Sequence, residues 1–318
     1  MGYAELERSL EAGGVVILDG GTGTELERRG VSMDPDAWCG PASLQNADVL
    51  TAIHRDYIDA GARIVTANTY ASSRLMLEPA GFGDAVAEIN RTAVRAAHRA
   101  REASGRDDVL VAGSLSHMCP LVHGDEAPDR ARAPSPDAMR AAFGELATLL
   151  VEEGCDLVLC EMLYDPERTP LVLDAALASG LPVWAGFSAR RGADGRVLGH
   201  APDVDVPLEE VVQHLAGRPM AAAGVMHTAS DLVAAALEVV RGHFDGPRYA
   251  YPDSGHFRMP HWQFEAVIPP RELVAYARRW RAAGVQGLGG CCGLSPEHIR
   301  ALADDPEICG AAVPAPGT

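Results

Sequence analysis

The stretch Val285-Gln286-Gly287-Leu288-Gly289-Gly290-Cys291-Cys292-Gly293 joins an apolar strand to two adjacent cysteines. Adjacent thiols are poorly placed to form a disulfide with each other, but they can bind one metal ion together. The alternative is that both cysteines are simply buried as small apolar residues. The flanking glycines let a ligand approach closely, and Ser295 is a good N-cap for a following helix. Because a catalytic zinc has three protein ligands and one open position, we expect Cys291 and Cys292 to provide two of them.

Seven other short β-branched or apolar runs alternate with stretches of helical periodicity, a pattern that predicts βα units around a parallel sheet. Eight units without a separating linker predict an α/β fold, a single (β/α)8 TIM barrel over residues 1–318. We expect helices at Ala47–Ala60, Ala85–Ala103 and Met139–Glu153. The expected strands are Val15–Leu18, Arg63–Ala67, Val109–Gly113, Leu157–Cys160, Val183–Phe187, Ala222–Val225, Arg248–Ala250 and Val285–Gly289.

The composition excludes several functions. A formal charge of −17 argues against nucleic-acid or anionic-membrane partners. With no signal-peptide pattern, no apolar run near the ~18 residues of a membrane span, and an odd count of seven cysteines, we expect a cytoplasmic protein. The chain contains no lysine, which excludes Schiff-base aldolases, lysine-bound pyridoxal phosphate and P-loop hydrolases.

Polar residues follow the predicted strands where a barrel of this kind carries its catalytic groups. Asp19 and Glu161 follow strands 1 and 4, and either could instead cap local backbone N–H groups. Glu161 has apolar neighbours, so its carboxylate needs a partner. The candidate substrate-binding residues are Asp19, Gly20, Thr22, Asn68, Tyr70, Ser114, Glu161, Tyr251, Asp253 and Ser254.

Taken in order, these motifs resemble the homocysteine S-methyltransferase family, zinc-dependent barrel enzymes that move a methyl group to a thiol. The match runs from Asp19-Gly20-Gly21-Thr22-Gly23-Thr24 through Tyr251-Pro252-Asp253-Ser254-Gly255 to Gly289-Gly290-Cys291-Cys292. The resemblance implies Zn2+ as cofactor and a small-molecule thiol acceptor such as homocysteine. The chain length resembles the branch whose donor is a sulfonium, S-methylmethionine or S-adenosylmethionine. The family resemblance implies no catalytic residue beyond the metal ligands.

One metal ligand departs from the family pattern. The family's third zinc cysteine follows strand 6, where this chain reads Gly224-Val225-Met226-His227, so the resemblance implies His227, Cys291 and Cys292 as ligands. The alternative for His227 is a hydrogen-bonded histidine at the mouth of the barrel. The family's acids at the positions of Asp19 and Glu161 hold the substrate's ammonium. Zinc with three thiolates has a formal charge of −1 and with two is neutral, so we expect a more Lewis-acidic metal here.

The loops also depart from the family, which leaves the acceptor and donor open. Ser114 is followed by Leu115-Ser116-His117-Met118-Cys119 instead of a Gly-Pro-Tyr-Gly-like turn, and His256 stands where an acid is common. We expect His117 and Cys119 to pack within their loop. Tyr70 or Trp38 could offer an aromatic face to a sulfonium. We expect structural or incidental roles for Cys39, Cys155, Cys160 and Cys309, and helix-surface positions for His54, His98 and His298.

Two other classes of function remain. The first is a different metal-dependent reaction on the same barrel, a lyase or hydrolase in which water takes the open position. The second is a thiol- or metal-binding protein that has lost transfer. A diverged acceptor within the family is a third possibility.

Overall fold

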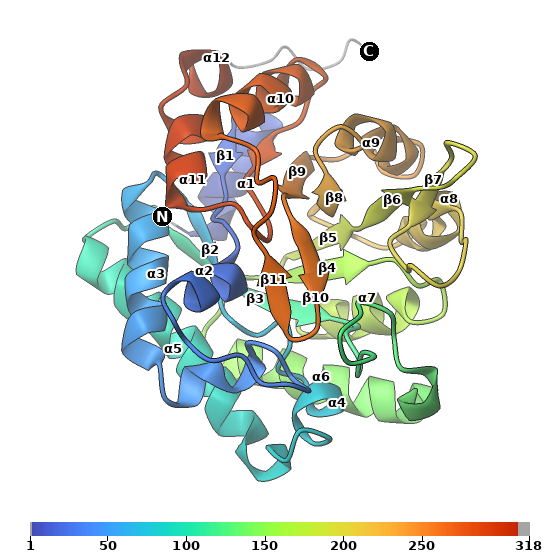
Figure 1. Ribbon diagram of the computed structural model, residues 1–318. Helices are drawn as coiled ribbons and strands as arrows, with labels where there is room; N and C mark the ends of the chain where they lie inside the picture. The colour runs from blue at the N-terminus through green and yellow to red at the C-terminus, as the bar shows by residue number, and fades with distance from the viewer. Residues whose placement is uncertain (1, 311–318) are drawn as a thin grey trace.

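Eight parallel strands form one sheet that closes on itself in the computed structural model, which describes residues 2–310 (Figure 1). Their order is β1-β12-β9-β8-β5-β4-β3-β2, and a parallel bridge between Leu18 and Ile64 joins the two ends. This confirms the expected TIM barrel. The strands are β1 (Val16–Ile17), β2 (Ile64–Thr66), β3 (Leu110–Ser116), β4 (Leu157–Leu163), β5 (Val183–Phe187), β8 (Ala222–Ala229), β9 (Arg248–Asp253) and β12 (Gly287–Leu288).

Helices surround the sheet, and the longer ones bury an apolar stripe. In α3 the residues Leu50, Ile53, Tyr57 and Ile58 are all buried. The three expected helices are confirmed to within three residues at each end. The helices are α1 (Tyr3–Glu11), α2 (Thr22–Arg28), α3 (Ala47–Asp59), α4 (Arg74–Leu77), α5 (Val86–Ser104), α6 (Pro136–Glu152), α7 (Thr169–Ala178), α8 (Leu208–Val212), α9 (Val233–Arg241), α10 (Pro270–Ala282), α11 (Pro296–Ala303) and α12 (Pro306–Cys309).

The barrel interior is filled by large side chains near the N-terminal ends of the strands. The rings of Trp184 and Tyr249 lie 5.3 Å apart and are fully buried. Gly224 is required beside them, because a Cβ there would overlap the backbone and ring of Tyr249. The N-terminal helix α1 lies at this end, where Trp184 Nε1 donates a hydrogen bond to the Tyr3 hydroxyl over 2.9 Å. The barrel interior is therefore closed at this end.

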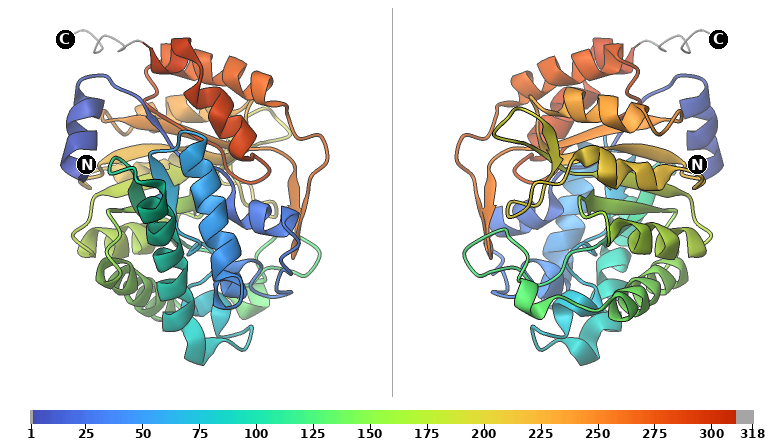
Figure 2. Two further views of the ribbon diagram at one scale, coloured as in Figure 1. Left: turned by 90° about the vertical axis from the view of Figure 1, so that its left-hand side faces the viewer. Right: turned by 90° about the vertical axis from the view of Figure 1, so that its right-hand side faces the viewer.

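Two hairpins and a long loop extend the C-terminal end of the barrel, and neither hairpin is among the elements expected from the sequence. They are β6–β7 (Ala189–Arg191, Val197–Gly199) and β10–β11 (His256–Arg258, His261–Gln263). Figure 2 shows β10–β11 at the end of the barrel opposite α1. The loop after β3 reaches this hairpin, since Gly124 N–H donates to Met259 O and Met259 N–H donates to Asp125 O.

Two helix-surface expectations are wrong. His54 is fully buried, and burial lowers its pKa to about 3, so the imidazole is neutral. It follows Leu50 by four residues and precedes Tyr57 by three, and so lies on the buried stripe of α3. His298 is buried as well. Its Nδ1 accepts a hydrogen bond from the N–H of Ser295, which caps the start of α11. No helix within residues 2–310 combines the length and apolarity needed to cross a membrane.

Candidate metal centre and substrate pocket

The three expected metal ligands converge at the C-terminal end of the barrel. One ligand atom each of His227, Cys291 and Cys292 lies within 4.8 Å of the other two. Cys291 Sγ is 3.6 Å from His227 Nδ1 and 3.9 Å from Cys292 Sγ. A tetrahedral zinc with bonds of about 2.0–2.3 Å spaces its ligand atoms by about 3.4–3.8 Å. The three side chains are only 5–8% exposed, and their spacing and chemistry fit zinc.

A β-bulge places His227 in the pocket wall. β8 pairs with β9 in regular register up to Met226 and Tyr251, and the register shifts before Ala229 pairs with Asp253. Within this interruption His227 has φ +43°, a left-handed conformation that costs on the order of 1–3 kcal/mol in a non-glycine residue. Surrounding contacts hold it there, because Thr228 Oγ1 donates to Met226 O over 2.8 Å. Bulges of this kind re-aim side chains at active sites.

A second bulge acts in the same way on Glu161. The register between β4 and β5 shifts between Cys160 and Leu163, and Met162 has φ +53°. Glu161 and Met162 both line the pocket. Both strained strand ends therefore serve the site, whereas a regular strand would have continued its alternation of inward and outward side chains.

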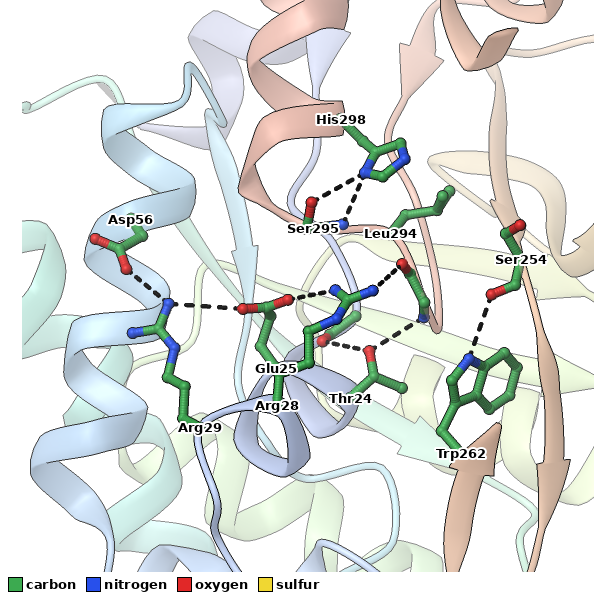
Figure 3. Close-up of polar contacts among 12 residues, drawn as sticks. Thr24, Glu25, Arg28, Arg29, Asp56, Ser254, Trp262, Leu294, Ser295 and His298 are labelled. Atoms are coloured by element: carbon green, nitrogen blue, oxygen red, sulfur yellow. Dashed lines mark hydrogen bonds and ion pairs between the residues drawn. The ribbon is translucent and has the colours of Figure 1, made fainter. Parts of the chain in front are cut away.

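Residues of α2 hydrogen-bond to Gly293, which directly follows the two cysteines (Figure 3). Arg28 donates to Gly293 O over 2.7 Å and to Glu25 Oε1 over 2.5 Å, while Thr24 Oγ1 accepts from Gly293 N–H over 3.1 Å. Gly293 has φ +81°, and a Cβ there would overlap the carbonyl oxygen of Ser254. Only glycine fits this turn without displacing the neighbouring strand end.

The end of β9 is fastened to the cysteines. Cys291 N–H donates to Pro252 O over 2.6 Å, and Ser254 N–H donates to Cys292 O over 3.0 Å. Between these bonds the Asp253 carboxylate lies 3.7 Å from His227 Nε2. Although burial opposes the charged imidazole, the Asp253 carboxylate and then the Cys291 thiol raise the pKa of His227 to about 9. Asp253 thus faces the expected metal ligand.

An open pocket of about 880 Å3 adjoins the three ligands. Six of the expected substrate-binding residues line it, whereas Asp19, Ser114, Asp253 and Ser254 do not. The six are Gly20, Thr22, Asn68, Tyr70, Glu161 and Tyr251. Lining residues that were not expected to bind substrate include Met118, Leu121, Glu126, Met162, Tyr164, His200, Phe257 and Trp262.

The two expected ammonium-binding acids lie in different environments. Asp19 is fully buried; its Oδ2 accepts from Thr66 N–H over 2.5 Å and its Oδ1 from the Tyr251 hydroxyl over 2.8 Å. Burial raises its pKa to about 6 against these hydrogen bonds. Glu161 lines the pocket, and burial raises its pKa to about 7, partly offset by the Ser114 hydroxyl. Glu161 is therefore the acid that can reach a ligand.

The Ser254 side chain supports the backbone, whereas the buried Ser114 hydroxyl lies next to Glu161. Ser114 N–H donates to Thr69 Oγ1 over 2.9 Å, behind the pocket wall. Ser254 Oγ accepts from Ile268 N–H over 2.9 Å, which ties the end of β9 to the segment before α10. Their assignment to substrate binding stays a prediction that this geometry does not favour.

The pocket lining favours a cationic ligand. Among the described residues its acidic side chains are Glu126 and Glu161, its basic side chains are the imidazoles of His200 and His227, and it includes no arginine. Trp38 packs edge-on against Phe257 at 5.3 Å and against Tyr70 at 6.2 Å between ring centroids. Aromatic faces attract ammonium and sulfonium groups, and nearby carboxylates strengthen that attraction.

The loop after β3 packs as a unit beside the pocket. His117 Nε2 accepts from Tyr164 N–H over 3.0 Å, and Arg168 donates to Cys119 Sγ over 2.7 Å. Met118 between them reaches the pocket. Cys39 also reaches it, with its thiol 3.3 Å from Asn68 Oδ1.

A histidine and two cysteines beside a pocket, at the C-terminal mouth of a TIM barrel, are typical of a barrel enzyme, and their ligand atoms form a candidate metal site. The family model for homocysteine S-methyltransferase matches residues 16–305. The chain belongs to the homocysteine S-methyltransferase family, whose reaction is methyl transfer to homocysteine, and it is an S-methyltransferase.

Relatives of known activity match along most of their length. The chain is 29% identical to the homocysteine S-methyltransferase of Escherichia coli (strain K12), with 93% of this chain and 97% of the relative covered. It is 26% identical to the selenocysteine Se-methyltransferase of Brassica oleracea var. italica, covering 94% and 91%. The crystal structure of the metallated homocysteine methyltransferase MmuM from Escherichia coli superposes with a TM-score of 0.73 at 26% identity, covering 94% of this chain and 98% of that one.

Proposed function

We propose that this protein transfers the methyl group of a sulfonium, S-methylmethionine or S-adenosylmethionine, to the sulfur of homocysteine, giving methionine, with Zn2+ held by His227, Cys291 and Cys292. The observation that carries the proposal is the convergence of these three ligand atoms within 4.8 Å in the wall of a cation-favouring pocket. The homocysteine S-methyltransferase of Escherichia coli supports the acceptor.

The donor set supports zinc as the cofactor. Two thiols and an imidazole suit zinc better than magnesium or calcium, which prefer oxygen ligands. A free thiol with a pKa near ~8.5 is only a few per cent thiolate at neutral pH. Zinc held by these residues would offer an open position and would lower the pKa of an acceptor thiol.

The chain's own residues hold the two substrates. Glu161 reaches the pocket with a carboxylate that can pair with the acceptor's ammonium. Asp19 already accepts from Thr66 and Tyr251, so it positions the Tyr251 ring and does not contact the ligand. The Thr22 hydroxyl is buried, has no hydrogen-bond partner among residues 2–310 and belongs to a residue that lines the pocket, so it can bind a polar ligand atom.

The aromatic groups suit a donor that loses its charge. Trp38, Tyr70 and Phe257 form the part of the lining that can face the sulfonium. Methyl transfer converts the sulfonium into a neutral thioether, so the cation–π attraction of about 0.5–2 kcal/mol disappears on transfer. The product is therefore released more readily than the donor, and a fixed approach of thiolate to methyl supplies rate through proximity.

The test is a methyl-transfer assay from both sulfonium donors to homocysteine, run on purified zinc-loaded protein and on protein stripped by a chelator. We expect methionine from the loaded protein, none from the stripped protein, and recovery on adding zinc. Cys309→Ala, which removes an exposed thiol far from the site, is the matched control for Cys291→Ala and should keep full activity. Full transfer by stripped protein, or no transfer by zinc-loaded protein with either donor, would contradict the proposal.

A selenol acceptor belongs in the same assay. The Brassica oleracea relative is a selenocysteine Se-methyltransferase. Selenocysteine in place of homocysteine therefore tests the diverged-acceptor alternative, and a preference for it would change the acceptor without changing the metal site.

A further inference from the structure

We propose that Asp253 is the positioning residue for His227: its carboxylate accepts the Nε2–H hydrogen bond of the imidazole and leaves Nδ1 to hold the metal. This inference rests on the proposed function, in which His227 is a zinc ligand. It gives Asp253 a role different from the substrate contact expected from the sequence.

The two ring nitrogens of His227 face different groups. Nδ1 lies 3.6 Å from Cys291 Sγ, on the side of the two thiols. Nε2 lies 3.7 Å from Asp253 Oδ2, on the side of the carboxylate. That separation is longer than a hydrogen bond by about 0.5 Å, a movement within reach of a small rotation of the ring. Metal-bound histidines almost always donate their second N–H to such a partner.

The backbone fixes Asp253 relative to the thiols. Its neighbours Pro252 and Ser254 are hydrogen-bonded to Cys291 N–H and Cys292 O over 2.6 and 3.0 Å. The carboxylate and both cysteines therefore belong to one rigid unit. A carboxylate held in this way can set the tautomer of His227 and the direction of its ring.

The other groups around His227 are already engaged. The His200 ring meets it edge-on at 4.9 Å, and His200 Nε2 is turned to Glu126, 3.8 Å from Oε2. The Trp262 ring lies 5.7 Å away, and its Nε1–H donates to Ser254 O. Among the described carboxylates, that of Asp253 is the one paired with Nε2 of His227.

The carboxylate also restores the charge that the histidine removes. Zinc with two thiolates and a neutral imidazole has no net formal charge, whereas three thiolates would give −1. Asp253 adds one negative charge next to the third ligand, so ligand and partner together carry the charge of a thiolate. The expected gain in Lewis acidity is therefore reduced, and the acceptor thiolate keeps its nucleophilicity.

The experiment measures zinc affinity by competition with a chromophoric chelator for wild type, Asp253→Asn, His227→Cys and the double variant. We expect Asp253→Asn to weaken zinc binding by about 10–100-fold, as removal of such partners usually does. In the His227→Cys background, where no imidazole needs positioning, the same change should cause no loss, or a gain. The control Asp231→Asn, an exposed carboxylate just beyond β8, should leave affinity unchanged.

A second readout keeps the test decisive if His227→Cys does not fold. In cobalt-substituted protein, Asp253→Asn should shift the visible ligand-field bands, and Asp231→Asn should not. Unchanged affinity and bands in Asp253→Asn, or equal zinc loss in both backgrounds, would overturn the assignment. A raised KM for homocysteine with unchanged zinc affinity would overturn it in favour of substrate contact. Wild type that binds zinc without methyl transfer would contradict only the proposed function, and wild type that binds no zinc would contradict both.

Discussion

Replacing Glu161 with glutamine should make the stability of the metal-free protein less sensitive to pH. Burial raises the pKa of this carboxyl from 4.5 to about 7, so the native state holds its proton where the unfolded chain has lost it. Wild type therefore loses stability as pH rises between 4.5 and 7 and levels off above 7. At about 1.36 kcal/mol per pKa unit, the full loss is roughly 3 kcal/mol.

The assay is urea unfolding of wild type and Glu161→Gln at pH 5.5 and pH 8, after removal of metal. Part of the loss has already occurred at pH 5.5. From pH 5.5 to pH 8 the free energy of unfolding of Glu161→Gln, relative to that of wild type, should therefore rise by roughly 2 kcal/mol. The test is how this difference in unfolding free energy changes with pH. A difference that is the same at both pH values would reflect only the contacts of the new amide. Glu88→Gln, at an exposed position on α5, controls for the loss of one negative charge.

The same unfolding measurement in the presence of homocysteine tests whether Glu161 binds the acceptor. If Glu161 pairs with the acceptor's ammonium, the ligand should stabilise wild type more than Glu161→Gln at pH 8. An unchanged stability difference between pH 5.5 and pH 8 would refute the reasoning about burial, and equal stabilisation of both proteins by homocysteine would refute the ammonium contact.

The remaining predictions concern the loop, the donor and the support from α2. Gly293→Ala should destabilise the protein by more than about 2 kcal/mol, whereas Gly30→Ala, also at positive φ but with open space around it, should cost about 1 kcal/mol; equal losses in urea unfolding would be inconsistent with the overlap at Ser254. Trp38→Ala should raise the KM for the sulfonium about threefold or more, and an unchanged KM would dismiss the aromatic contact. Arg28→Ala should lower stability by about 1.5–3 kcal/mol and weaken zinc binding. A zinc affinity equal to that of wild type in a chelator titration would show that the hydrogen bond from Arg28 to Gly293 O does not position the cysteines.

The sequence predicts the barrel well because its signals are local. Each strand is a short apolar run, and each helix carries a stripe that periodicity reveals, so all eight strands and the three named helices are found in the structure. His54 is an exception, because its spacing from Leu50 and Tyr57 places it on the buried stripe and not on the helix surface. The hairpins β6–β7 and β10–β11 have short strands with no comparable apolar signal.

The site is only partly predictable because its geometry depends on neighbouring strands. The motif order predicts His227, Cys291 and Cys292, and these residues do converge. The bulge that gives His227 its positive φ follows from the register between β8 and β9, which the residues of β8 alone do not specify. Asp253 is the last residue of β9, where a substrate contact is expected, yet the backbone hydrogen bonds of Pro252 and Ser254 to the cysteines place its carboxylate beside His227.

The most direct test of the zinc–thiol account is zinc K-edge X-ray absorption of the zinc-loaded protein without and with homocysteine. The account predicts two sulfurs at about 2.3 Å and at least one nitrogen at about 2.0–2.1 Å before addition, and a third sulfur afterwards. A sulfur count that does not rise with homocysteine, or three protein sulfurs at the outset, would contradict it.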